Sequence, residues 1–230
     1  MTRLRAQKSL GVETRDGCQP GRWALWWQWA LATTVGELAG FAVPAVVGSV
    51  ATRAMEGMAG ATQAITMLLL VTLAGIVEGA TLGLAQSLVL RRYIRNLAWR
   101  EWIRNTALAA GLAYILGMTP STLMEVTTVN LIILLIVAIL FIPALLASIG
   151  VAQWLVLRRY VQKAGWWVLA NAIAWIAGLA MPFIGLTLVP DGSPVAAYIA
   201  AGVMSGVLMG AVVGGITGIV LVRLLEQPVS

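Results

Sequence analysis

Histidine does not occur in this 230-residue sequence, cysteine occurs once, and lysine occurs only at Lys8 and Lys163. Serine, cysteine and zinc proteolysis therefore lack their usual bases or ligands, and the commonest haem ligand is missing as well. Cys18 has no second thiol with which to form a disulfide or a metal site. We therefore expect a protein that is not an enzyme, and we predict neither a cofactor nor a metal.

Charged residues are also scarce, because they make up 10% of the chain whereas hydrophobic residues make up 60%. Soluble domains carry about one charged residue in four, so water is not the main solvent of this chain. The formal net charge of +6 does not indicate nucleic-acid binding, since the basic residues lie between apolar runs. We expect the lipid bilayer to be the main partner, and leave membrane-protein partners or a homo-oligomer open.

Apolar runs long enough to cross a membrane recur along the chain. A hydrocarbon core of about 30 Å takes roughly 20 apolar residues per helix. Helix is the only open choice, because a backbone in lipid must satisfy its own hydrogen bonds and the alternation of a barrel strand is absent. We predict an all-α integral membrane fold with six transmembrane helices, over Trp23–Val50, Ala64–Leu90, Ile103–Met118, Val126–Leu157, Trp166–Val189 and Val195–Val222.

The basic residues fall almost entirely on one side of this predicted topology. Fourteen of the fifteen lie before the first span, after the last, or between the second and third or the fourth and fifth, and only Arg53 lies in an opposite loop. Short basic loops stay in the cytoplasm, so both termini are predicted to be cytoplasmic. We expect residues 1–22 to form a cytoplasmic polar tail, 23–223 a single six-helix membrane domain, and 224–230 a short cytoplasmic tail.

An internal repeat ends alternate spans. GLAQSLVLRRY at Gly83–Tyr93 and GVAQWLVLRRY at Gly150–Tyr160 differ at two of eleven positions and lie 67 residues apart. A weaker third copy, Gly214–Arg223, ends the sixth span. We therefore predict three tandem helical hairpins, at about 23–95, 96–163 and 164–223. Direct repeats with an even number of spans share one orientation, so we expect a pseudo-threefold bundle around an axis along the membrane normal.

Glycines four residues apart predict where helices approach each other closely. Small residues at this spacing form a flat groove, and in lipid such packing replaces the missing hydrophobic drive. The sequence leaves open whether the grooves pack within the bundle, against another copy or along a pore. The predicted helix-packing residues are Gly75, Gly79, Gly83, Gly202, Gly206, Gly210, Gly214 and Gly218.

Nine of the ten tryptophans fall near the basic ends of the predicted spans. An indole anchors a helix at headgroup level, and we interpret these residues as such an anchoring belt. The arginine pairs that end the second and fourth spans are predicted to contact lipid headgroups. They are Arg91, Arg92, Arg158 and Arg159. Gln86 and Gln153 recur just before these pairs, which favours a structural role such as interhelical hydrogen bonding.

Two carboxylates, Glu37 and Glu78, lie inside predicted spans. A charge at mid-bilayer costs roughly 3 kcal/mol or more, which makes such residues functional candidates. At 1.5 Å per residue, Glu37 lies about 16 Å from Trp26 and Glu78 about 20 Å from Arg91, so both are near the midplane. If they face each other, both cannot stay ionised, and the pair would share a proton or recruit a cation. The threonines within one helical turn that would complete an oxygen-rich site are Thr33, Thr34 and Thr81.

The run from Gln153 to Trp175 reads QWLVLRRY followed, after three residues, by AGWWVLANAIAW. It resembles a class of uncharacterised polytopic bacterial membrane proteins, of cyanobacterial and Chloroflexi type, with repeated GxxQWxVLRR elements followed by paired tryptophans. The resemblance covers roughly residues 79 to 223. It implies a bacterial inner (plasma) membrane location and carries no activity with it.

Two functions remain open on the sequence. The first is an accessory or scaffold subunit, or a lipid-interacting membrane module, in which the acids are protonated and hydrogen-bonded as packing groups. The second is a small proton- or cation-dependent transporter or channel that uses Glu37 and Glu78. The equivalent positions of the other hairpins carry no acid, so the hairpin architecture itself does not require one.

Overall fold

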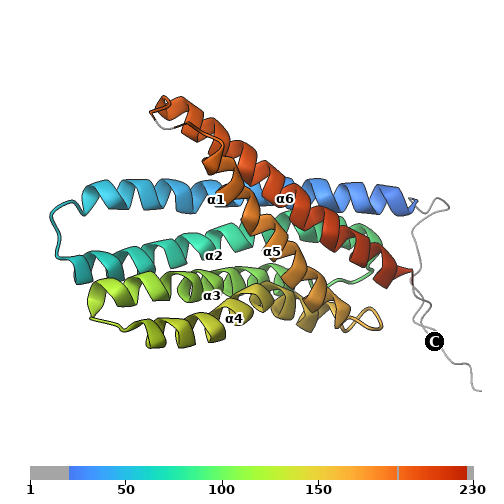
Figure 1. Ribbon diagram of the computed structural model, residues 1–230. Coiled ribbons are helices and arrows are strands. Elements are labelled where there is room, and N and C mark those ends of the chain that lie inside the picture. Colours follow the sequence, from blue (N-terminus) through green and yellow to red (C-terminus); the bar gives the residue numbers. More distant parts are fainter. Residues whose placement is uncertain (1–20, 191, 227–230) are drawn as a thin grey trace, which may run out of the picture.

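The computed structural model of the chain describes residues 21–190 and 192–226. Most of the predicted N-terminal tail, with Cys18, and most of the predicted C-terminal tail therefore lie outside the described residues. Six helices make up most of the described chain (Figure 1), and each is long and apolar enough to span a membrane, as predicted. They are α1 (Arg22–Ala54), α2 (Gly60–Tyr93), α3 (Trp99–Val126), α4 (Leu131–Leu157), α5 (Trp166–Thr187) and α6 (Val195–Leu225).

The helices form a closed ring in chain order. Each packs against the helices that precede and follow it, and α6 packs against α1. An ion pair between Arg22 Nε and Glu226 Oε1 joins the start of α1 to the end of α6. Figure 1 shows α5 and α6 crossing α1 and α2 obliquely, while α2, α3 and α4 lie side by side.

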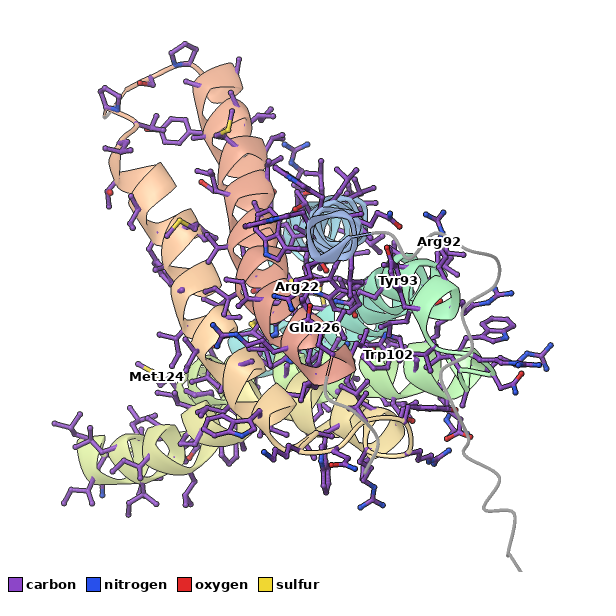
Figure 2. All side chains as sticks on the ribbon, turned by 90° about the vertical axis from the view of Figure 1, so that its right-hand side faces the viewer. Arg22, Arg92, Tyr93, Trp102, Met124 and Glu226 are labelled. Carbon is purple, nitrogen blue, oxygen red and sulfur yellow. The ribbon has the colours of Figure 1, made fainter. Side chains whose placement is uncertain are left out.

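The hairpins are packed tightly at one end of the ring and spread apart at the other. A core cluster, which includes Trp29, Leu90, Trp102, Leu157 and Trp167, lies at the end where α2 and α4 finish and α3 and α5 begin. In α4, every buried residue lies within its last nine positions. Figure 2 looks at this packed end, from which the α3–α4 and α5–α6 hairpins diverge.

The third span is longer than its apolar run. The sequence predicts Ile103–Met118, whereas α3 extends from Trp99 to Val126. Hydroxyl groups in the added segment bond to their own helix: Thr119 donates to the Ile115 carbonyl at 2.6 Å, and Ser121 to the Met118 carbonyl at 2.9 Å. Because these polar groups are satisfied locally, the helix continues past the point where hydropathy falls.

The turns between helices carry their own local signals. The side chain of Asn130 caps α4 by accepting a hydrogen bond of 2.9 Å from the Ile133 amide. In the linkers that follow α2 and α4, Asn96 and Lys163 both adopt positive φ angles, of 57° and 53°. These two residues are separated by the same 67 positions as the two close copies of the sequence repeat.

Candidate functional site

Glu37 lies in the middle of α1 and is 1% exposed. It faces α6 at a glycine, since a Cβ added at Gly210 would lie 3.2 Å from the Glu37 Cβ. Neither oxygen of its carboxyl group has a hydrogen-bond partner among the described residues. A buried carboxyl without donors is costly in either protonation state, and far more costly when charged.

Glu78, in α2, is 8% exposed and lies against α1 where that helix has a glycine. A Cβ added at Gly40 would lie 3.0 Å from the Glu78 carbonyl oxygen and 3.1 Å from its Cγ. Gly40 lies one helical turn after Glu37 on α1, so Glu78 packs against α1 within one turn of Glu37. The two acids of the sequence hypothesis therefore share one interior region between α1, α2 and α6.

Tyr114, in α3, is a member of this region that sequence reasoning missed. Its hydroxyl donates a hydrogen bond of 2.7 Å to Glu78 Oε2. The ring packs against α2 at Gly75, where an added Cβ would overlap it. A glycine one turn before an intramembrane acid was the available signal, but nothing in the sequence names the aromatic residue that uses the space.

The three threonines predicted to complete the acid site bond elsewhere. The Thr34 hydroxyl donates to the Ala30 carbonyl at 2.8 Å, and the Thr81 hydroxyl donates to the Val77 carbonyl at 2.9 Å. Thr33 is fully buried, and its hydroxyl accepts a hydrogen bond of 3.3 Å from Gln86 Nε2. Thr33 thus belongs to a second polar region, one helical turn from Glu37.

That second region, the glutamine cluster, consists of Thr33, Gln86, Thr106, Gln153 and Trp167. Gln153 is fully buried at its centre. Its Nε2 donates to Gln86 Oε1 at 2.8 Å and to Thr106 Oγ1 at 3.1 Å, and its Oε1 accepts from Trp167 Nε1 at 3.1 Å. Five polar side chains from α1, α2, α3, α4 and α5 are joined in this way, as the interhelical role suggested for the glutamines requires.

Three tryptophans meet beside the glutamine cluster. The rings of Trp29, Trp102 and Trp167 have centroids 5.6 to 6.3 Å apart, and all three are fully buried. Trp29 Nε1 donates to Thr217 Oγ1 at 2.9 Å, whereas Trp102 Nε1 has no partner among the described residues. The interpretation of these three as interface anchors is therefore wrong. It suits Trp23 and Trp27, which are 75% and 64% exposed.

The predicted packing glycines divide into two groups. Added Cβ atoms at Gly75, Gly79 and Gly83 would meet α3, and those at Gly210, Gly214 and Gly218 would meet α1. At Gly206, the nearest atom would be a leucine methyl group 4.0 Å away, and at Gly202 there is none within 4 Å. The close contact of α6 with α1 therefore covers Gly210 to Gly218 and does not include Gly202 and Gly206, which lie where the α5–α6 hairpin diverges.

The four arginines predicted to meet headgroups have different neighbours. The Arg91 guanidinium lies 5.3 Å from the centroid of Trp99, and that of Arg158 lies 4.8 Å from Trp154. Arg92 donates to Gln28 Oε1 at 3.0 Å. Arg159 forms an ion pair of 2.9 Å with Glu101. Arg92 is labelled in Figure 2, at the packed end of the ring.

An open groove of about 520 Å³ runs between α3 and α4. Alanines, including Ala144 and Ala147, form part of its lining, together with Leu108, Leu112 and Leu155. Within residues 21–190 and 192–226, no three acidic, cysteine or histidine side chains gather into a metal-binding group. The buried acids of the described chain are Glu37 and Glu78.

Residues 21–190 and 192–226 form six helices of membrane-spanning length and hydropathy, with two buried acids in the first hairpin. The chain matches no protein-family model, no curated protein and no solved structure.

Proposed function

We propose that the chain is a non-catalytic, multi-pass protein of a bacterial inner membrane with both termini in the cytoplasm. The helix bounds support this orientation, since the basic residues of the described chain other than Arg53 lie at the packed end. Short basic segments resist translocation, so this end would face the cytoplasm. The sequence resemblance to polytopic bacterial proteins favours the same location.

We further propose that the three hairpins are copies of one unit, arranged with pseudo-threefold symmetry. Three like contacts support this arrangement. Added Cβ atoms at Gly83, Gly150 and Gly214 would each meet two residues, three positions apart, on the following odd-numbered helix, with α1 following α6. The pairs are Ile103 and Thr106, Val168 and Asn171, and Ala30 and Thr33. The first residue of each pair directly follows a tryptophan of the buried triad in the sequence.

For activity, we propose a small proton- or cation-dependent transporter or channel that uses Glu37 and Glu78. The observation that carries this proposal is the Glu37 carboxyl, which is buried at mid-helix without a donor for either oxygen. A packing role would call for hydrogen bonds to threonine or carbonyl groups, and the neighbouring threonines bond elsewhere. An intramembrane acid that packing does not explain marks an ion pathway by default.

The two acids would divide the work unequally. The Tyr114 hydroxyl stabilises negative charge on Glu78, while Glu37 has no such donor. Because unlike environments favour unlike protonation states, Glu37 would hold the proton when Glu78 is ionised. One proton passing between the two acids, or one small monovalent cation in its place, would keep the net charge of the pair and its bound ion at about −1.

Reconstitution in liposomes tests the proposal. Wild-type protein is expected to dissipate an imposed gradient of H⁺, Na⁺ or K⁺, read by an entrapped fluorescent indicator, and Glu37→Gln and Glu78→Gln are expected to lower that flux to the empty-liposome level. Glu56→Gln, which removes an exposed acid, is the matched control and should keep the flux. Absence of wild-type flux for all three ions, or full flux in both buried-acid variants, would remove the proposal.

The second candidate is the accessory, scaffold or lipid-interacting subunit, and the first half of α4 favours it. Large apolar residues there are exposed over most of the helix surface, and only the face of Leu134, Val137, Ala138 and Phe141 is half-buried. The exposed residues include Leu131, Ile132, Ile133, Leu135, Ile136, Ile139, Leu140 and Ile142. A helix that is apolar all round must be covered by lipid or by another protein. Co-purification of one stoichiometric partner from native membranes, lost when Ile136 and Ile139 become serine, would support this role.

A further inference from the structure

We propose that Arg91 and Arg100, held on the ring of Trp99, form a binding site for the phosphate of an anionic phospholipid. The two arginines come from different helices, the end of α2 and the start of α3. Their guanidinium carbons lie 5.3 Å and 5.2 Å from the same indole centroid. This site does not depend on the acid pair or on the transport that we propose for it.

The Trp99 indole is a shared contact for two guanidinium groups. Each guanidinium can stack on the electron-rich ring. The two guanidinium carbons are no farther apart than the sum of their distances to the ring centroid, about 10.5 Å, and an anion that contacts both side chains offsets the repulsion between their like charges. A phosphate with several acceptor oxygens suits this position, because guanidinium groups bind phosphate oxygens with paired hydrogen bonds.

Nearby carboxylates of the described chain already have partners. Glu101, directly after Arg100 in the sequence, is paired with Arg159 at 2.9 Å. At this end of the ring, the other described acid is Glu226, which is paired with Arg22. Among the described residues, no carboxylate therefore forms an ion pair with Arg91 or Arg100.

An anionic phospholipid fits this place better than free phosphate does. Arg91 ends α2, and the residues three and seven positions before it lie on the same helical face. Those residues, Leu88 and Leu84, are 51% and 47% exposed. An apolar stripe thus leads away from the cationic pair towards mid-membrane, where an acyl chain of the bound lipid would lie.

Native mass spectrometry of the full chain in nonionic detergent tests the proposal, with dioctanoyl phosphatidylglycerol as the probe and dioctanoyl phosphatidylcholine as the zwitterionic reference. We expect phosphatidylglycerol to bind preferentially, and the Arg91→Gln/Arg100→Gln pair to weaken its tightest site by roughly tenfold or more. Trp99→Leu keeps the charge but frees the arginines, so it should weaken the site by a smaller factor. The control pair, Arg104→Gln/Arg223→Gln, removes the same charge from exposed positions of the same end and should change binding less than twofold.

Equal losses in the site pair and the control pair would overturn the proposal in favour of diffuse attraction. Displacement of the lipid by an equal concentration of glycerol phosphate would also overturn it, because the apolar stripe would then contribute nothing. If the glutamine pair does not fold, Arg91→Lys/Arg100→Lys keeps the charge without the planar stacking group. Unchanged phosphatidylglycerol binding in that variant would count equally against the site.

Discussion

Tyr114 on α3 donates a hydrogen bond of 2.7 Å to Glu78 Oε2 on α2, while Glu37, the other acid of the pair, receives none from the described chain. The difference gives two chemically identical side chains unlike environments within one membrane interior. Glu78 has a hydroxyl donor for one of its oxygens, whereas both oxygens of Glu37 are buried without a donor among the described residues. This asymmetry is consistent with the proton site that we propose.

Replacing Tyr114 with phenylalanine tests the asymmetry directly. Tyr114→Phe keeps the ring that packs on Gly75 and removes only the donor, so Glu78 loses the group that stabilises its charge. We expect proton or cation flux to fall well below wild type, and stability in detergent to drop by about 1 to 3 kcal/mol. Liposome flux and the thermal unfolding midpoint measure the two effects.

Tyr198→Phe is the control for this change, because the Tyr198 hydroxyl makes only a long, exposed bond of 3.4 Å to the Pro190 carbonyl. It should leave both flux and midpoint near wild type. Wild-type flux in the Tyr114→Phe protein would show that the hydrogen bond does not serve transport.

The glutamine cluster gives a second prediction, at Gln153. Gln153→Leu keeps the approximate volume and removes three hydrogen bonds, leaving Gln86 Oε1 and Trp167 Nε1 buried without them. Interhelical bonds in membranes average about 0.6 kcal/mol each, so we expect a loss of roughly 2 kcal/mol in the free energy of unfolding. Unfolding in mixed micelles with increasing dodecyl sulfate measures it. Gln28→Leu, which loses one exposed bond to Arg92, should cost far less, and equal costs would contradict a central role for Gln153.

Gly79 supplies a third prediction, about close helix contact. A Cβ there would lie 2.7 Å from the Thr106 carbonyl oxygen and 2.9 Å from the Ala107 Cα, so Gly79→Ala must push α2 away from α3. We expect a loss of about 1 to 3 kcal/mol. Gly202→Ala is the matched control, since nothing lies within 4 Å of its added Cβ and the alanine favours helix by up to about 1 kcal/mol. The same micelle titration compares them, and a Gly79→Ala protein as stable as the Gly202→Ala protein would contradict the contact.

Much of the helical framework could be predicted from the sequence. A span through lipid requires a long apolar run, and its backbone must satisfy its own hydrogen bonds, which restricts the run to a helix. The α3 boundary was not predictable from hydropathy, since Thr119 and Ser121 satisfy their hydroxyl groups within the helix. Tyr114 was not predictable as a partner of Glu78, because 36 residues separate them and only the packing of α2 on α3 brings them together.

The buried tryptophans were misassigned for a physical reason. A tryptophan near a basic helix end is usually an interface anchor, and composition alone cannot distinguish an anchor from a core residue. The helical phase does distinguish them in α1, where Trp29, Thr33 and Glu37 follow one another every four residues along the buried face. Trp23 and Trp27 are out of that phase and are exposed.

The buried tryptophan triad gives the last prediction, which compares three equivalent substitutions. Trp29→Phe, Trp102→Phe and Trp167→Phe each remove a similar volume from the same cluster, but only Trp29 and Trp167 lose an indole hydrogen bond. Trp102 Nε1 is already buried without a partner in the described chain, so its removal relieves an unsatisfied donor. We therefore expect Trp102→Phe to be less destabilising than the other two by about 1 kcal/mol or more. Thermal midpoints of the three variants in one detergent provide the test, and a Trp102→Phe protein that is the least stable of the three would contradict it, because the Trp102 N–H would then have to be bonded in the folded protein.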